Sequence, residues 1–471
     1  MVKRRASEGA TTEIDGVPSR IVSRFLQWTL VCHPSGKAPL PPKEDRLEMS
    51  FIRAYFWPLF LLIFTLATTV VIPVTVYHYG GSLGRLWAET TLELFVQQIP
   101  RPTCTAAAIL FGWTLIQGLL QELVPGAKIY GPPTPAGERP EYVDNGIKCW
   151  IITHVGWVIL GPMTNAIPCG QLYPNMGSVI TTANLFAVPF CVFLYWKGRV
   201  YPSSRDAVWT GIFPFDFFQG VELHPRLLNL NVKQLLNCRV SMMGWSLSHL
   251  CFAQYQYENG VLSSGMIVHV SLLVLYLFKF FWWEAGYFAS IDIIHDRCGY
   301  YIVWGVLCWV PTCYFSPGFT LVEQPMYWPA STAAIVFAVG ILALWVNYTA
   351  DYQRQVARAT DGNCLIWGRR PDLIRAEYTT SEGVTRKSLL LVSGYWSISR
   401  HFNYIPELTL ALMWSLPANI QLALPWAYWG FLFFLLIDRS SRDDEKCREK
   451  YGKYWDEYCR RVPYKIIPYV Y

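Results

Sequence analysis

The stretch STAAIVFAVGILALWVNYTADYQRQVAR, Ser331 to Arg358, joins an apolar segment to a basic end. Residues 332–350 carry no charged side chain, and about 20 apolar residues allow a helix to cross a bilayer. If that helix continues past Tyr352, Arg354 and Arg358 lie one turn apart on the same face. Two guanidinium groups at this spacing can bind phosphate oxygens, or they can mark the membrane boundary by reaching toward lipid headgroups. The stretch alone leaves both interpretations open.

The whole sequence has the composition of a membrane protein. Of its 471 residues, 53% are hydrophobic and only 15% are charged, which is unlike a soluble enzyme of this length. We therefore expect an all-α polytopic membrane protein with about ten transmembrane helices. The apolar runs that predict them lie near 54–77, 103–124, 146–165, 177–198, 240–256, 262–283, 299–315, 332–350, 404–416 and 421–437. The net charge of +6 then belongs to the membrane surface, and no nucleic-acid-binding pattern accompanies it.

The basic residues are distributed unevenly between the loops. Lys and Arg are absent from 165–177, 257–261, 316–331 and 417–424. They are concentrated in the alternate segments, so the positive-inside rule predicts that both termini are cytosolic. We expect the first span to insert the chain, since no signal-peptide segment precedes it. The predicted parts are a polar tail at 1–50, a membrane body with eight spans at 51–350 and a C-terminal cofactor-binding part with two spans at 351–471.

Polar side chains gather near the end of the chain. The segment SGYWSISRHFNY (393–404) places Arg400, His401 and Asn403 at the mouth of a hydrophobic span, where charged groups are costly and usually functional. Further on, one helical face is expected to carry Asp443, Cys447, Lys450, Tyr451, Tyr454 and Tyr458. With the two arginines, these residues predict a C-terminal pocket for a phosphorylated cofactor with aromatic rings. No GxGxxG or GxxxxGKS/T motif is present, which excludes a Rossmann domain and a P-loop.

The cysteines and histidines do not predict a metal site. The 13 cysteines form no CxxC pair, and no histidine lies at zinc-ligand spacing from them. Reduced thiols and no metal are therefore expected.

Five motifs along the chain resemble those of one family, the sterol reductases, which includes the Δ14-, Δ7- and Δ24(28)-sterol reductases and the reductase domain of the lamin B receptor. Two motifs are central, GIFPFDFFQGVELHPR (211–226) and FFWWEAGYFASIDIIHDRCGYYIVWG (280–305). Three are C-terminal, DGNCLIWGRRP (361–371), LLLVSGYWSISRHFNY (389–404) and YGKYWDEYCRRVPYKIIP (451–468). The resemblance covers the chain from about residue 50 onward and implies a sterol taken from the bilayer, NADPH as cofactor and residence in the endoplasmic reticulum membrane. Other enzymes of sterol biosynthesis are possible partners.

The resemblance also implies which residues contact NADPH. They are Arg354, Arg358, Leu391, Trp396, Asn403, Tyr404, Asp443, Cys447, Arg448, Glu449, Lys450, Tyr451 and Tyr458, and Arg400 joins them by its place at the mouth of the pocket. Two positions depart from the family pattern. The first basic position is often Lys in relatives and is Arg354 here. After the Asn-Tyr pair, relatives usually have Gly-Asp-Leu, whereas this chain has Ile405-Pro406-Glu407-Leu408. The proline therefore helps to set the direction of the following span.

Within the family, the loop TPAGERPEYVDNG (134–146) resembles the Δ7-sterol reductases, which favours reduction of the C7–C8 bond of a Δ5,7-sterol over Δ14 reduction. Protonation of C8 in such a diene leaves an allylic cation at C7, and hydride then reaches that carbon. The enzyme therefore needs a proton donor, a hydride donor and an apolar slot with rings that tolerate positive charge.

Ionisable residues close to the membrane are candidates for the proton donor. The motif at 280–305 offers Glu284, Tyr287, Asp292, His295 and Asp296, although Asp292 or Asp296 could instead cap the next helix. Asp216 and Glu222 are candidates for orienting the sterol or bracing a loop.

Three other classes of protein fit parts of this pattern. A methyltransferase of the isoprenylcysteine type shares the RHxxY-like turn, but it is much shorter and lacks the central motifs. A non-catalytic sterol-binding protein would have lost residues of the cofactor pocket, which are all present here. A transporter usually shows inverted repeats with interrupted helices, and no such pair is visible.

Overall fold

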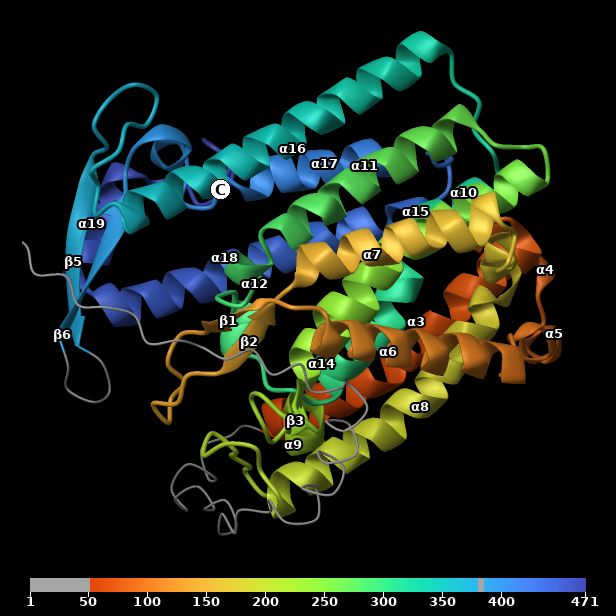
Figure 1. Cartoon of the computed structure of the whole chain (residues 1–471), viewed down its shortest axis with the longest axis horizontal. Coiled ribbons are helices and arrows are strands. Elements are labelled where there is room, and N and C mark those ends of the chain that lie inside the picture. Colours follow the sequence, from red (N-terminus) through yellow and green to blue (C-terminus); the bar gives the residue numbers. More distant parts are fainter. Residues whose placement is uncertain (1–50, 380–384) are drawn as a thin grey trace, which may run out of the picture.

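The computed structural model describes residues 51–379 and 385–471, which are mostly helical (Figure 1). The polar tail at 1–50, including its basic start, lies outside the described residues. Within this described part of the chain, seven helical segments are long and apolar enough to cross a membrane: Ala54–Tyr79, Cys104–Leu123, Gly146–Met163, Cys169–Val200, Ser264–Trp282, Tyr300–Glu323 and Ala330–Ala359. They confirm the expectation of a polytopic helical membrane protein.

The corresponding elements are α3 (Trp57–Tyr79), α6 (Cys104–Leu123), α7 (Gly146–Val158), α8 (Leu172–Val200), α11 (Ser264–Trp282), α14 (Tyr300–Trp304), α15 (Ser316–Glu323) and α16 (Ala330–Ala359). π-Helical segments extend or connect three of them: η1 (Ile52–Phe56), η2 (Ile159–Met163) and η5 (Gly305–Tyr314). A further π-helical segment, η4 (Gln234–Met242), leads into the helix that begins at Met243. In η5, Pro311 cannot donate an intrahelical hydrogen bond, which explains why the helix widens there.

The three remaining predicted spans are also helical, but each is shorter or more polar. They are α10 (Met243–Glu258), α17 (Tyr404–Ser415) and α18 (Ala427–Tyr451), whose second half is charged. Their apolar faces pack into one hydrophobic core with α11 and α15, through Trp245, Trp414 and Tyr428 among others. The count of ten transmembrane helices therefore stays a prediction.

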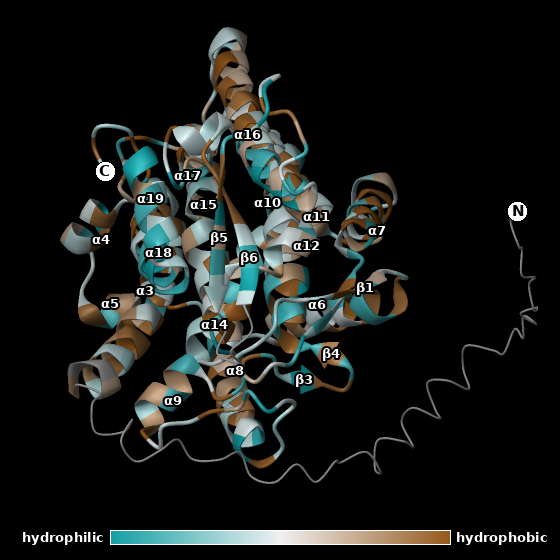
Figure 2. Cartoon of the chain, turned by 90° about the vertical axis from the view of Figure 1, so that its left-hand side faces the viewer, coloured by the Kyte–Doolittle hydropathy of each residue, from teal (hydrophilic) through white to brown (hydrophobic). Residues whose placement is uncertain are grey.

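Three antiparallel hairpins were not expected from the sequence. They are β1 (Ala127–Tyr130) with β2 (Glu141–Asp144), β3 (Arg226–Leu227) with β4 (Leu230–Asn231), and β5 (Leu373–Thr379) with β6 (Thr385–Leu391). The longest, β5–β6, packs Ile374 and Leu390 against α18 and α19 (Lys453–Arg461) through Tyr451 and Trp455. Figure 2 faces this end of the molecule and shows the hydrophilic helix α19 beside the hairpin.

The remaining elements are short: α4 (Leu83–Glu89), α5 (Leu92–Gln98), η3 (Cys169–Gln171), α9 (Phe213–Gln219), α12 (Glu284–Tyr287), α13 (Ile291–Ile294), η6 (Gly394–Ser397) and η7 (Leu424–Trp426). The helix α16 passes through residue 350 without a break and packs along α17. The C-terminal part is thus built onto the last long helix of the membrane body.

Candidate active site

A cavity of about 310 Å³ lies where the end of α16 meets β6, η6, α18 and α19. Most of the predicted cofactor residues line it together: Arg354, Arg358, Leu391, Trp396, Arg400, Asp443, Cys447, Lys450, Tyr451 and Tyr458. The wall is therefore cationic and aromatic, with one carboxylate among these residues. This chemistry suits an anionic ligand that carries rings.

Arg354 and Arg358 lie on the last turns of α16, which continues past Tyr352 as predicted. The guanidinium carbon of Arg354 lies 4.6 Å from the centre of the Trp396 ring. That ring is fixed because its Nε1 donates to the carbonyl oxygen of Ala350 at 2.8 Å, and only 2% of the residue is exposed. Trp396 therefore orients Arg354 by a cation–π contact.

The predicted single helical face at 443–458 is divided between two helices. Gly452 ends α18 with φ +51° and ψ −123°, a conformation that other residues rarely adopt, and α19 begins at Lys453. The turn brings Tyr458 of α19 back to the cavity, whereas Tyr454 is not in its lining. The expectation of one continuous stripe was wrong in this respect, because a side-chain pattern alone does not reveal a backbone break.

On the α18 side of the cavity, Cys447 contributes a neutral thiol and Lys450 contributes a cation. Burial, reinforced by Asp443, raises the pKa of the Cys447 thiol to about 12, so the thiol stays protonated. The Lys450 ammonium lies 4.3 Å from the ring centre of Tyr378 and 5.0 Å from that of Tyr451. These two rings hold the cation at the edge of the cavity.

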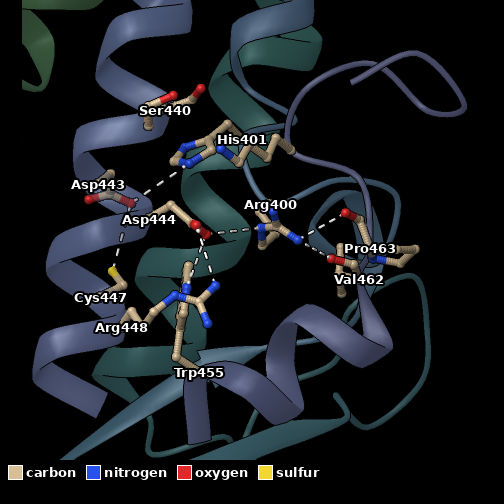
Figure 3. Close-up of polar contacts among 12 residues, drawn as sticks. Arg400, His401, Ser440, Asp443, Asp444, Cys447, Arg448, Trp455, Val462 and Pro463 are labelled. Atoms are coloured by element: carbon tan, nitrogen blue, oxygen red, sulfur yellow. Dashed lines mark hydrogen bonds and ion pairs between the residues drawn. The ribbon is translucent and has the colours of Figure 1, made fainter. Parts of the chain in front are cut away.

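Arg400 lines the cavity but is occupied by the C-terminal segment (Figure 3). Its Nη1 donates to the carbonyl oxygens of Val462 at 2.8 Å and Pro463 at 3.0 Å. Its Nε lies 3.7 Å from an oxygen of Asp444, and 7% of its side chain is exposed. Its backbone N–H donates to the carbonyl oxygen of Tyr464 at 3.0 Å. Arg400 therefore joins two chain segments that form the wall.

His401 faces Asp443 across the same network (Figure 3), with Nε2 3.8 Å from a carboxylate oxygen. Its backbone N–H donates to the carbonyl oxygen of Lys465 at 2.8 Å. Burial lowers the pKa of His401 to about 4, and the cations Arg354 and Arg400 act in the same direction against Asp443. The imidazole is therefore neutral at neutral pH.

Asn403 and Tyr404 lie next to the cavity but are not in its lining. The Nδ2 of Asn403 donates to Oδ1 of Asp351 at 3.2 Å. The Tyr404 ring stacks on His401 with a centre-to-centre distance of 5.1 Å. Asn403 therefore connects the start of α17 to α16, whereas the Tyr404 contact lies within the segment that leads into α17.

Arg448 and Glu449 point away from the cavity on the outer side of α18. Arg448 pairs with Asp456 at 2.8 Å and approaches Asp444 at 3.6 Å, and 56% of its side chain is exposed. Glu449 is exposed. Helical periodicity explains both positions, because they fall between the inward-facing residues Cys447 and Lys450.

Of the five predicted proton donors, His295 is the one that lines the cavity. Although its ring is open to the cavity, partial burial lowers its pKa to about 4, and the nearby Lys446 ammonium contributes. The neutral imidazole can donate or accept a hydrogen bond at neutral pH. It is therefore a hydrogen-bonding group rather than a charged acid.

Asp292 lies on the short helix α13, and Asp296 directly follows His295 after that helix. Asp292 forms an ion pair with Arg439 of α18, with 2.6 Å between Oδ2 and Nη2. The backbone of Asp296 is held in place by the buried Lys233, whose Nζ donates to the Asp296 carbonyl oxygen at 2.6 Å. Burial, with Asp292 in addition, raises the pKa of the Asp296 carboxyl. The structure shows neither residue capping a helix.

Tyr287 is enclosed beside this loop. Its ring packs edge-on against Phe280 at 5.1 Å, and burial raises the pKa of its hydroxyl well above the usual value. The phenol is therefore protonated.

Glu284 is completely buried in an ion pair with Arg239. The Oε2 of Glu284 accepts from Arg239 Nη2 at 2.9 Å, and the same Nη2 donates to Oδ1 of Asn145 at 2.7 Å. This pair joins α12, η4 and the start of α7. The ion pair with Arg239 is itself a sufficient reason for the burial of the Glu284 carboxylate, and a part for Glu284 in proton donation stays a prediction.

Asp216 and Glu222 brace loops. Asp216 accepts from the backbone N–H of Thr210 at 2.8 Å and of Gly211 at 2.9 Å. Glu222 forms an ion pair with Lys197 at 2.8 Å, and 1% of its side chain is exposed. Neither residue lines the cavity, and their role in orienting a sterol stays a prediction.

The cavity also contains residues that the sequence did not single out: Ala289, Ile294, Leu390, Lys446 and Trp455. Lys446 could have been found, because it lies three residues after Asp443 on the same helical face. Ala289 and Ile294 could not have been found, because their aliphatic side chains have no functional groups. The fold of the segment after α12 brings them to the cavity.

The fold and the cavity together define a polytopic helical membrane protein with a cationic, aromatic site at one end of its bundle. The chain belongs to the Ergosterol biosynthesis ERG4/ERG24 family, whose sequence model matches residues 52–471. It is a membrane-embedded sterol reductase by family.

Named relatives have similar lengths. The chain is 42% identical over 429 residues to 7-dehydrocholesterol reductase of Arabidopsis thaliana, covering 89% of this chain and 98% of the relative. It is 32% identical to 7-dehydrocholesterol reductase of Danio rerio, covering 81% and 83%. It is also 32% identical to Delta(14)-sterol reductase of Methylotuvimicrobium alcaliphilum, covering 84% and 91%. These matches confirm the family expected from the motifs.

Proposed function

We propose that the chain reduces the C7–C8 double bond of a Δ5,7-sterol, with NADPH as the reductant. The observation that carries the proposal is the cavity, which brings the predicted cofactor residues together from α16, β6, η6, α18 and α19. Both candidates within the family, Δ7 and Δ14 reduction, use this same site.

The lining fits NADPH chemically. Within residues 51–379 and 385–471, neither Arg354 nor Arg358 has a carboxylate partner, although both face the cavity. Two unpaired guanidinium groups favour phosphate oxygens. The rings of Trp455 and Tyr458 are positioned to contact the ring systems of the cofactor.

The lining residues would have different roles in binding the cofactor and in the reaction. Arg354 and Arg358 hold phosphate groups, and Trp396 keeps Arg354 in place. When bound, NADPH supplies the hydride for the reduction. The neutral His295 offers a hydrogen bond at the cavity wall, Tyr287 of α12 keeps its hydroxyl proton, and burial raises the pKa of the Asp296 carboxyl.

The loop Thr134–Gly146 and the relatives favour Δ7 reduction over Δ14. The relative named 7-dehydrocholesterol reductase from Arabidopsis is 42% identical, whereas the relative named Delta(14)-sterol reductase is 32% identical. In the structure this loop contains most of the connection after β1 and the strand β2, which pairs with β1. The distribution of basic loops supports cytosolic termini, and the family supports residence in the endoplasmic reticulum membrane.

The test is to incubate membranes that contain the chain with NADPH and either 7-dehydrocholesterol or a Δ8,14-sterol, and to identify products by gas chromatography and mass spectrometry. A product saturated at C7 that retains the 5,6 double bond supports the proposal. Reduction of only the Δ8,14-sterol replaces it with the Δ14 function. Turnover of neither sterol contradicts both and favours a sterol-binding protein. The Arg354→Ala, Arg358→Ala double variant, expressed to the same level, is the matched control for cofactor dependence.

A further inference from the structure

A second cavity, of about 170 Å³, lies among the membrane-spanning helices, between α6, α8, η4, α10 and η5. Its lining shares no residue with that of the first cavity, among the residues that the structure describes. In Figure 1, α8 runs along the lower edge of the bundle and α16 along the upper edge. The two cavities are therefore separate sites, built from different helices.

The wall of the second cavity is almost entirely apolar. Leu110 of α6, Met176 of α8 and Leu307 of η5 are buried and line it, and none of the described lining residues carries a charge. A phosphate headgroup or a fatty-acid carboxylate would lose its hydration here without gaining a charged partner, which is costly. The wall therefore favours an uncharged, largely apolar ligand.

A hydroxyl group of this wall lacks a partner. The Oγ of Ser241 is buried and has no hydrogen-bond partner within residues 51–379 and 385–471, and only 6% of the residue is exposed. The indole of Trp113, on the facing helix, is already bound, because its Nε1 donates to the carbonyl oxygen of Val240 at 3.0 Å. A buried hydroxyl without a partner is destabilising, so a ligand that carries one hydroxyl group would be favoured beside Ser241.

Small residues on one helical face leave the space for such a ligand. Ser241, Gly244 and Ser248 follow one another at intervals of three and four residues, so they lie on the same face of η4 and α10. From Ser241 to Ser248 the helix axis advances by about 10 Å. Across the cavity, a Cβ atom at Gly244 would lie 3.4 Å from Nε1 of Trp113. The open face is therefore long and narrow, which suits a rigid, elongated molecule.

The position of the cavity fits a ligand that comes from the bilayer. Phe111 and Leu115, on the outer face of α6, are 46% and 63% exposed, so this face meets lipid. Ser241 lies at the start of the predicted span that follows the basic segment 199–239, which the positive-inside rule places on the cytosolic side. The free hydroxyl therefore lies toward one membrane surface, and a lipid with a small polar head and an apolar body would bind in this orientation.

We propose that this cavity binds a sterol that is not reduced there. The sterol hydroxyl and the Ser241 hydroxyl share one hydrogen bond, and the fused rings pack along Gly244 and Ser248 against α6, α8 and η5. The family acts in sterol biosynthesis, so the inference rests on the family and not on the Δ7 proposal. Because its wall contains no residue of the first cavity, the bound sterol lies away from the proposed source of hydride.

The experiment measures sterol binding to the purified protein in phospholipid nanodiscs. The probes are cholesterol, which lacks the C7–C8 double bond, its analogue without the 3-hydroxyl group, and a diazirine derivative of cholesterol whose cross-links are mapped by mass spectrometry. Gly244→Leu fills the cavity, and Ser241→Ala removes the hydroxyl. Gly156→Leu is the matched control, because a Cβ atom there meets open space and Gly156, on α7, is not among the lining residues.

We expect cross-links on α6, α8 and α10 in the wild type and the control, and their loss in Gly244→Leu. The wild type should bind cholesterol about fivefold more tightly than the analogue without the hydroxyl, as one hydrogen bond predicts. In Ser241→Ala this preference should disappear, and the comparison is independent of the stability of the variant because both ligands bind the same protein. Turnover of 7-dehydrocholesterol and the NADPH dissociation constant should stay within about twofold of wild type in Gly244→Leu, since distant sites act independently.

Four outcomes would overturn the inference. Cross-links confined to residues around the first cavity, or equal binding of cholesterol and its analogue to the wild type, would leave the second cavity without a sterol. Competition by diacylglycerol as strong as that by cholesterol would assign it to chain lipids. Loss of turnover in Gly244→Leu with unchanged NADPH binding would make it the substrate site. Failure of the wild type to reduce any sterol would remove the proposed function but leave the binding result, so the two failures are distinguishable.

Discussion

Replacement of Arg400 should damage the wall of the cavity rather than remove a direct cofactor contact. The guanidinium donates to two carbonyl oxygens of the C-terminal segment, at Val462 and Pro463, and approaches Asp444. Only 7% of its side chain is exposed, so water cannot replace these contacts easily. Arg400→Ala would leave both carbonyl groups and the carboxylate without this partner.

The expected cost follows from the contacts. Each hydrogen bond from a charged donor contributes about 1.5–3 kcal/mol, and removing one member of a buried charged pair costs about 3–5 kcal/mol. We therefore expect Arg400→Ala to lower the free energy of unfolding by about 3–5 kcal/mol. Arg400→Lys keeps the charge but loses the planar fork, so its loss should be smaller.

The assay measures unfolding of the detergent-solubilised protein and, separately, NADPH affinity at a temperature where each variant is folded. Arg448→Ala is the control, because 56% of that arginine side chain is exposed and its pair with Asp456 lies outside the cavity. The control should change stability by no more than about 0.5 kcal/mol. If Arg400→Ala keeps wild-type stability but loses NADPH affinity, the reasoning is wrong and Arg400 binds the cofactor directly.

Three further predictions follow from single contacts. Trp396→Ala removes the ring beneath Arg354 and should raise the NADPH dissociation constant about tenfold, measured by titration, whereas Trp396→Phe should lose less. Gly452→Ala should destabilise the protein by about 1–3 kcal/mol in an unfolding assay, because alanine is strained at φ +51° and ψ −123°. Burial lowers the pKa of His224 to about 3, so the unfolded chain binds a proton below about pH 6.5 when the folded chain does not. Stability should therefore fall as the pH is lowered from about 6.5 toward 3, and His224→Gln should flatten this dependence; an unchanged slope would contradict the assignment.

The sequence predicts the helices well, because an apolar run must become a helix to satisfy its backbone inside a membrane. It also predicts the position of Arg354 and Arg358, because a helix that continues past Tyr352 determines their common face. These are local properties, which require only the spacing of residues along one element. Lining residues that share one helix, such as Asp443, Cys447 and Lys450 of α18, could be predicted from their spacing in the same way.

The partners of the charged residues could not be predicted in this way. Glu284 pairs with Arg239 and Asp292 pairs with Arg439, in each case across a long separation in sequence. The residues that flank Glu284 and Asp292 in the sequence do not reveal that these carboxylates are paired with arginines. The hairpin β5–β6 was missed for a related reason, since its pairing depends on contacts with α18 and α19.

Charge near a membrane therefore indicates function only when its partners are known. The rule that such residues are functional selected Glu284 and Asp292, whereas helical spacing selected Arg354 and Arg358. The structure separates them, because the two carboxylates are neutralised by arginines whereas the two arginines face a cavity. A paired charge is satisfied by the fold, and an unpaired charge at a cavity wall still requires a counter-ion. This difference makes the end of α16 the strongest candidate for binding a phosphorylated ligand.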